Sequence, residues 1–266
     1  MPMSGNVRLT KSEMKYARSL AQPKVRDHEK KFVIEGWKTV QDALRSGFRL
    51  DFIGVTKTFL DDPEYRAIIR EVRTHGIALK ELSDVELKQV CDTVHAQGIV
   101  ALAQQKSRTL DEVLASPAHL VVLADHIADP GNLGTMIRTC DWFSADALVL
   151  SEGCVDLYNE KVVRSTAGSI FHIPVVEHTD VHEVITKLGR KGFKIFATAG
   201  EAKVSYRDAE YGEKNLIIFG NESSGIGKET RQLADETISI PRKGKAESLN
   251  VGVSTGIILS HIANSD

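Results

Sequence analysis

The second half of the chain alternates short apolar runs with segments of helical periodicity. The runs are LVVLA at 120–124, ALVLS at 147–151, KIFATA at 194–199 and NLIIFG at 215–220. Runs this short and this free of polar residues are typical of strands buried on both faces, and intervening helices make such strands parallel. We therefore predict an α/β domain with a parallel sheet over residues 120–266, which binds ligands beyond the carboxyl ends of its strands.

The first hundred residues predict a smaller α/β unit. Thr10 and Glu13 form a T-x-x-E capping box that begins a basic helix, and a second capping box at Ser83 begins a helix that closes near Gly98. The other predicted elements are an exposed loop at 21–31, a helix at 32–43, a strand at 50–55, an amphipathic helix at 66–76 and a strand at 99–104. We place this domain at residues 1–104 and a polar linker at 105–119.

Composition favours an ordinary folded protein, with 42% hydrophobic and 26% charged residues. The cysteines Cys91, Cys140 and Cys154 are too few and too scattered for a disulfide framework or a metal site, so we expect reduced thiols and no metal. No leader sequence or membrane span is visible. We expect a cytoplasmic protein.

Positive charge gathers at the start of the chain. Residues 1–31 contain eight basic and three acidic residues, although the whole chain carries a net charge of −2. A charge run of this kind is by itself typical of a solvated helical face. It becomes a candidate for polyanion binding only if a neighbouring site requires one.

Three polar motifs each follow a predicted strand end. The first, DPGNLGTMIR at 129–138, leads into a helix that carries Asn132 and Arg138 on different faces, since six residues turn an α-helix by about 240°. A capped helix with a surface arginine is the alternative interpretation. The arginine offers five donors in a planar fork that suits phosphate.

The second motif is FGNESSGIG at 219–227, where glycines permit close approach of a ligand and Glu222 stands beside the strand end. It matches neither of the common nucleotide-binding fingerprints, and an ordinary glycine-rich turn is the alternative. The third motif, IPRKGKAESLN at 240–250, precedes an apolar helix that we expect to begin near Ser248. That helix is either core or a subunit interface.

Together and in this order, the three motifs resemble those of the SpoU family in the SPOUT superfamily of methyltransferases. The resemblance covers residues 120–266, and residues 12–104 resemble the family's RNA substrate-binding domain more loosely, chiefly in EKKFVIEGWKTVQDAL at 29–44. It implies a parallel-sheet domain with a C-terminal trefoil knot, a homodimer formed through the knot region, and S-adenosylmethionine as cofactor. The implied reaction is methylation of a ribose 2′-hydroxyl in RNA.

The resemblance also assigns residues. It implies an active site formed by Asn132, Arg138, Glu222, Ser248 and Asn250. It implies a cofactor pocket lined by Thr198, Gly200, Gly220, Asn221, Ile240 and Leu249. With a polyanionic substrate, the basic stretch at Lys24, Arg26, Lys30 and Lys31 becomes the expected RNA contact. Two positions depart from the family pattern, because Ser223 stands where many relatives have glycine and Arg242 where they often have methionine.

A ribose hydroxyl is a poor nucleophile until its proton leaves or is shared. Arg138 is the residue to which the family assigns this task, yet a guanidinium stays protonated in proteins. We hypothesise that Arg138 binds the adjacent phosphate and stabilises the developing alkoxide while phosphate or water takes the proton. The sequence leaves the proton acceptor open.

The sequence allows two alternative functions, a dehydrogenase and a non-catalytic RNA-binding protein. A nicotinamide-dependent dehydrogenase would suit the α/β pattern, but no strand is followed by GxGxxG. A non-catalytic RNA-binding protein would not need the polar residues of all three motifs. We favour large-subunit ribosomal RNA over transfer RNA as substrate, and the nucleotide cannot be read from the chain. His126, His172, His178 and Cys140 are assigned no role.

Overall fold

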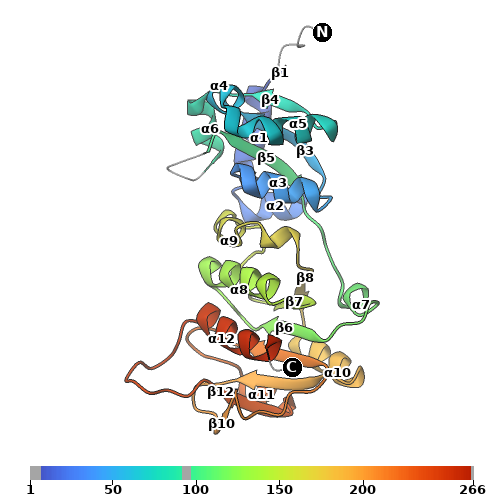
Figure 1. Cartoon of the computed structure of the whole chain (residues 1–266), viewed down its shortest axis with the longest axis vertical. Helices are drawn as coiled ribbons and strands as arrows, with labels where there is room; N and C mark the ends of the chain where they lie inside the picture. Colours follow the sequence, from blue (N-terminus) through green and yellow to red (C-terminus); the bar gives the residue numbers. More distant parts are fainter. Residues whose placement is uncertain (1–6, 92–96, 265–266) are drawn as a thin grey trace. The chain divides into compact units, whose positions relative to one another are not determined.

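The computed structural model describes residues 7–91 and 97–264, which divide into two compact units (Figure 1). The first contains residues 1–106 and 158–171, and the second residues 107–157 and 172–266. The segment 158–171 therefore packs with the first unit, although the sequence places it within the second domain. Its aromatic rings explain this, because Tyr158 and Phe171 lie 4.5 and 6.4 Å from Phe32 between ring centroids.

The first unit is built on a mixed sheet with strand order β1-β4-β3-β5-β2. The strands are β1 (Val7–Arg8), β2 (Lys31–Glu35), β3 (Leu50–Val55), β4 (Leu79–Glu81) and β5 (Ile99–Gln104). The helical segments are α1 (Lys11–Ser19), α2 (Pro23–Glu29), α3 (Trp37–Arg45), α4 (Lys57–Asp61), η1 (Pro63–Tyr65), α5 (Arg66–Thr74), α6 (Asp84–Val90), α9 (Glu160–Ser165) and η2 (Ser169–Phe171). Apolar residues of α1 and α6 pack with β2, β3 and β5 in one core cluster.

Two predictions for this unit are wrong. The expected loop at 21–31 contains α2, and the expected helix at 32–43 begins as β2 and becomes helical only at Trp37. Lys30 and Gly36 both have positive φ, 51° and 85°, so sharp backbone turns separate the apolar residues of β2 from the helices on either side. An apolar run this short does not reveal by its period alone whether it is strand or helix.

The predicted capping boxes at Thr10 and Ser83 are both present. α6 ends at Val90, earlier than the predicted end near Gly98, and residues 92–96 of that prediction lie outside the described residues. A third capping box at Thr109 begins the short helix α7 (Leu110–Val113) within the predicted linker.

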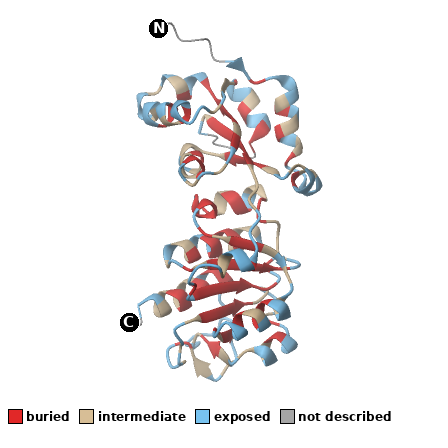
Figure 2. Ribbon diagram, turned by 90° about the vertical axis from the view of Figure 1, so that its right-hand side faces the viewer, coloured by how far each residue is buried: buried red, intermediate tan, exposed pale blue. Residues whose placement is uncertain are grey.

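The second unit has, in its described residues, a seven-stranded sheet with order β10-β12-β9-β11-β6-β7-β8, and every neighbouring pair is parallel. Its strands are β6 (Leu120–Ala124), β7 (Ala147–Ser151), β8 (Val175–Thr179), β9 (Lys194–Thr198), β10 (Val204–Ser205), β11 (Asn215–Phe219) and β12 (Glu236–Ser239). Every residue of β6, β7 and β11 is buried, as Figure 2 shows. The predicted parallel sheet is confirmed.

The helices of this unit besides α7 are α8 (Pro130–Trp142), α10 (Val181–Arg190), α11 (Lys228–Leu233) and α12 (Val251–Ala263). Leucine and valine side chains of α10 join one core cluster with alternate residues of β6 and β11, so α10 covers one face of the sheet. α8 and α12 pack against each other. None of the described helices combines the length and the apolar character that a bilayer span requires.

The buried Arg26 side chain yields the first prediction. Its Nη1 donates to the carbonyls of Leu20 (2.6 Å) and Ala21 (2.8 Å) and so satisfies the end of α1. Arg26→Met leaves these acceptors without their charged donor, so we expect a loss of about 2 kcal/mol in the free energy of unfolding, measured by urea denaturation. The control Lys24→Met, at an exposed position on the same helix, is expected to change little. An Arg26→Met protein as stable as the wild type would contradict this assignment.

Candidate functional site

The first motif begins helix α8 directly after β6. Asp129 is the N-cap, and its side chain accepts from the Asn132 amide nitrogen at 2.8 Å, while Pro130 occupies the first turn, where a missing N–H costs nothing. This local geometry fixes Asn132 at the start of the helix. Its side chain is left free to bond with other loops.

Asn132 joins the other two motifs through both ends of its side-chain amide. Nδ2 donates to Glu222 Oε1 at 2.7 Å, and Oδ1 accepts from Asn250 Nδ2, also at 2.7 Å. Residues separated by 90 and 118 positions in sequence thus form one hydrogen-bonded chain, Glu222–Asn132–Asn250. An asparagine suits the central position because it offers donors and an acceptor at once.

Sheet register and helix packing explain why these residues meet. β6 and β11 are neighbours with Ala124 opposite Phe219, so the loops that follow them leave the sheet side by side. α12 approaches α8 closely at Gly252, where an added Cβ would lie 2.7 Å from the Thr135 methyl group. Asn250 caps α12, its Oδ1 accepting from the Val253 amide at 3.2 Å. The N-cap is therefore Asn250, two residues after the predicted Ser248.

The loop of the second motif is held closed by its own side chains. Asn221 Oδ1 accepts from the amides of Ser223 (2.9 Å) and Ser224 (3.1 Å), and its Nδ2 donates to the His126 carbonyl at 2.8 Å. A Cβ at Gly220 would lie 2.4 Å from the Gly225 carbonyl carbon, which only glycine avoids. Asn221 therefore shapes the loop, and the loop positions Glu222.

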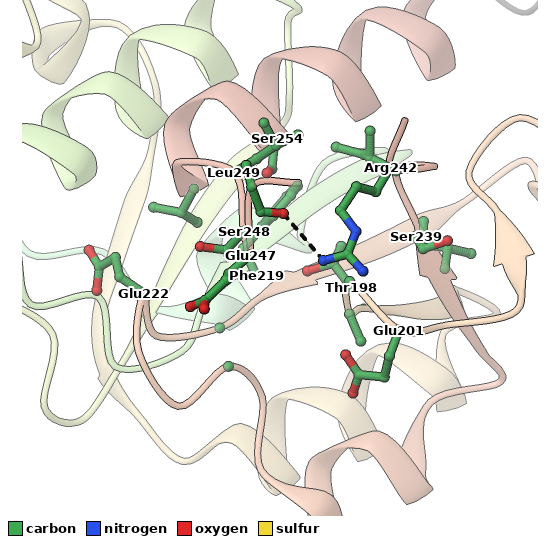
Figure 3. Close-up of a pocket in the computed structure, with 18 of the residues that line it drawn as sticks. Thr198, Glu201, Phe219, Glu222, Ser239, Arg242, Glu247, Ser248, Leu249 and Ser254 are labelled. Atoms are coloured by element: carbon green, nitrogen blue, oxygen red, sulfur yellow. Dashed lines mark hydrogen bonds between the residues drawn. The ribbon is translucent and has the colours of Figure 1, made fainter. Parts of the chain in front are cut away.

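A cavity of about 740 Å³ lies beside this chain of hydrogen bonds (Figure 3). All six residues predicted to line a cofactor pocket do line this cavity, namely Thr198, Gly200, Gly220, Asn221, Ile240 and Leu249. Glu222 and Ser248 line it as well. The cavity lies beyond the ends of β9, β11 and β12, which is where a parallel sheet is expected to bind a ligand.

An ion pair at the cavity wall lies outside the residues that the sequence predicts for the site. Arg231 Nη1 pairs with Glu201, and Arg231 Nε donates to the Ile226 carbonyl at 2.9 Å, so this arginine ties α11 to the loops after β9 and β11. The hydrogen bond from Arg231 lowers the pKa of Glu201 below its ordinary value. Neither residue belongs to the three motifs, and only the charge opposition of a Glu and an Arg 30 residues apart could have suggested the pair.

Arg138 stands apart from the other predicted catalytic residues within one chain. It is exposed on α8 and is not among the residues that line the cavity. Ser248 is exposed at the cavity wall. A single chain therefore brings together Asn132, Glu222, Ser248 and Asn250 at or beside the cavity, without the guanidinium.

The four residues predicted to contact RNA differ in their surroundings. Lys24 and Lys30 are exposed, although Lys30 pairs with Asp27. Lys31 pairs with Asp51 at 2.5 Å, and this hydrogen bond raises the lysine's pKa. Arg26 is buried, so its expected role as an exposed RNA contact is wrong.

Other reactive side chains carry no sign of chemistry. The three cysteines are free, and burial raises the pKa of Cys91, Cys140 and Cys154. His126 Nδ1 lies 2.6 Å from Asp125 Oδ1, and its ring packs over Gly153. Within residues 7–91 and 97–264, no cluster of His, Cys, Asp and Glu could hold a metal ion.

Asn132→Asp tests the hydrogen-bonded chain. The variant sets a second carboxylate against Glu222, and two carboxylates at that distance raise the pKa of one of them above its unfolded value. The pair is then tolerated at low pH, where it holds a proton, and becomes destabilising as pH rises through the raised pKa. We expect the thermal midpoint to fall increasingly below that of the wild type between pH 5 and pH 8.

The control for this variant is Asn159→Asp, the same change at the N-cap of α9, where aspartate serves as well as asparagine. We expect its thermal midpoint to follow that of the wild type across the same pH range. A deficit in Asn132→Asp that does not vary with pH would contradict the contact with Glu222.

Comparison with known proteins places this geometry in a family. The SpoU rRNA Methylase family matches residues 119–260, and the MRM3-like substrate binding domain matches residues 11–101. The chain is 36% identical over 260 residues, 94% of its length and 99% of the relative's, to the 23S rRNA (guanosine(2553)-2′-O)-methyltransferase RlmP of Bacillus subtilis. It is 28% identical over 234 residues, 84% of its length and 94% of the relative's, to the 23S rRNA (guanosine-2′-O-)-methyltransferase RlmB of Xanthomonas axonopodis pv. citri.

A solved structure of an rRNA methyltransferase has a similar fold. The AdoMet-bound rRNA methyltransferase from Sinorhizobium meliloti superposes with a TM-score of 0.85 at 28% identity, over 97% of this chain and 96% of that one. The family match covers more than half of the chain and includes all three motifs that form the cavity and the Glu222–Asn132–Asn250 contact. The chain belongs to the SpoU family of RNA methylases.

Proposed function

We propose that this protein transfers a methyl group from S-adenosylmethionine to a ribose 2′-hydroxyl of large-subunit ribosomal RNA, in the cytoplasm. The observation that carries the proposal is the Glu222–Asn132–Asn250 chain beside a cavity lined by residues of three strand-end loops. The 23S rRNA specificity of the relatives named above supports ribosomal RNA as the substrate.

The cavity fits the cofactor. Backbone groups of the loops at Thr198, Gly220 and Ile240 can reach an adenine, and the side chains of Ile240 and Leu249 offer apolar cover. Bound there, S-adenosylmethionine supplies an electrophilic methyl group on a sulfonium. The Glu222 carboxylate lines the same cavity and favours a cation in it.

The chain's own residues have to position the ribose and assist loss of its proton. The Glu222–Asn132–Asn250 chain holds its polar groups in fixed directions, so they act without reorganising. Arg138 remains protonated and can bind the phosphate next to the ribose, where it stabilises the developing alkoxide while phosphate or water takes the proton.

Arg138 reaches such a site in a homodimer. Trp142 follows Arg138 by one helical turn and is 79% exposed, and Val253 on the neighbouring α12 is 50% exposed. A large apolar side chain left in solvent is typical of an interface. We propose that α8 and α12 of two copies pack together, which buries Trp142 and brings each Arg138 to the partner's cavity.

We also propose the family's trefoil knot for the C-terminal segment. Its course supports this, because the chain leaves β12 and returns past the β11 loop to place α12 against α8. In the first unit, the exposed Lys24 and Lys30 remain the proposed RNA contacts, where they would position the RNA without reading its sequence.

The direct test is methyl transfer in vitro. The protein is incubated with S-adenosylmethionine labelled in the methyl group and, separately, with large-subunit ribosomal RNA and with transfer RNA from cells that lack the gene. We expect label in one ribose of the ribosomal RNA. Label in transfer RNA alone would mean that transfer RNA, and not ribosomal RNA, is the substrate. Cofactor binding without methyl transfer to either RNA would favour a non-catalytic RNA-binding protein.

A mixing experiment tests the shared site. Arg138→Lys keeps the charge but loses the fork, and Glu222→Gln loses the carboxylate, so each variant alone is expected to lose most turnover. Mixed dimers contain one intact site, so an equal mixture after subunit exchange should recover about a quarter of wild-type activity. Arg190→Lys, an exposed arginine of α10, serves as control and should keep full turnover. If the activity of the mixture were no greater than the summed activities of the two variants measured separately, the partner would not supply Arg138.

A further inference from the structure

Arg242 extends into the cavity from the exposed loop that follows β12. It lines the cavity, and its Nη1 donates to the Ala246 carbonyl of the same loop at 3.3 Å. In Figure 3 the guanidinium lies between Leu249 and Thr198, over the cavity. The bond to Ala246 is long and uses one of five N–H groups, so most of the fork remains available to a ligand.

The charges around the cavity single out this arginine. Its described lining residues include three carboxylates, Glu201, Glu222 and Glu247, and three cations, Arg231, Arg242 and Lys243. Arg231 is already engaged by Glu201 and by the Ile226 carbonyl. In the described part of the chain, Arg242 is then the lining guanidinium that pairs with no carboxylate.

S-adenosylmethionine has one anionic group, the carboxylate of its methionine moiety. That group is repelled by the three lining carboxylates and attracted by an uncommitted guanidinium, whose two parallel N–H groups match a carboxylate in a bidentate pair. We propose that Arg242 binds the α-carboxylate of S-adenosylmethionine. This inference rests on the proposed function.

The positions of Glu222 and Arg242 agree with this assignment. Figure 3 shows them on opposite sides of the cavity. The methyl group has to face the Glu222–Asn132–Asn250 chain, so the sulfonium lies toward the carboxylate of Glu222. The carboxylate of the cofactor is then free to point toward Arg242, so the sulfonium and the carboxylate each face a group of opposite charge.

A contact to an RNA phosphate is the alternative role for Arg242, because a guanidinium also binds phosphate in a bidentate pair. The bond to the Ala246 carbonyl holds the exposed side chain over the cavity, between Leu249 and Thr198, and this position favours the cofactor. Lys245, in the same loop, is exposed and is not among the residues that line the cavity, so it offers a cation for comparison.

Equilibrium binding of two ligands separates the possibilities. S-adenosylhomocysteine carries the carboxylate, whereas 5′-methylthioadenosine has the same adenosine and thioether but lacks the amino-acid group. Titration calorimetry of each ligand is carried out on the wild type, Arg242→Met and Lys245→Met. We expect Arg242→Met to lower the affinity for S-adenosylhomocysteine about tenfold to a hundredfold. The affinity for 5′-methylthioadenosine should not change. Lys245→Met should bind both ligands as the wild type does.

Several results would overturn the inference. An equal loss of affinity for both ligands would show that Arg242 shapes the loop or stacks on adenine. Unchanged affinity for both ligands, together with weaker RNA binding, would assign Arg242 to RNA. If the wild type bound S-adenosylhomocysteine but Arg242→Met bound it equally well, this inference alone would fail. If the wild type did not bind S-adenosylhomocysteine at all, the proposed function would fail with it.

Discussion

The site depends on one side-chain amide, that of Asn132. Its nitrogen donates to Glu222 and its oxygen accepts from Asn250, so the amide is fixed in direction and joins the second and third motifs to the start of α8. Asn250 also caps α12, which couples the start of that helix to the same contact. A leucine or alanine at position 132 could not serve, because both neighbours would lose their partner.

This contact lies at an open surface in the single chain. Residues 241–250 are all exposed, and so are Arg138 and Trp142 on α8. A catalytic centre needs its polar groups shielded from water to make them effective. The proposed dimer and the bound RNA would together supply that cover, which explains why one chain presents an incomplete site with a formed cavity.

The sequence predicted those parts of the structure in which local pattern and tertiary environment agree. β6, β7 and β11 are buried on both faces and read as unbroken apolar runs, and the capping boxes at Thr10 and Ser83 carry their own hydrogen-bonding partners. The three motifs were found because glycine, asparagine and glutamate cluster after strand ends. Their convergence followed from the rule for parallel sheets.

The misses share a physical cause, which is that the decisive contact is distant in sequence. β2 is a strand because it pairs with β5, and Val25 of α2 packs against a core cluster that includes Phe52 and Leu102. The segment 158–171 packs with the first unit through rings that meet Phe32. The Arg231–Glu201 pair depends on how two loops approach each other. None of these partners is visible in a local window.

The most direct measurement of the central claim is a map of 2′-O-methylated riboses in large-subunit ribosomal RNA. RNA is compared from cells with the wild-type gene, without the gene, and with a Glu222→Gln gene expressed to the same level. The account predicts that one ribose loses its methyl group in the deletion, regains it with the wild-type gene and stays unmethylated with Glu222→Gln. An unchanged methylation map in the deletion strain would contradict it.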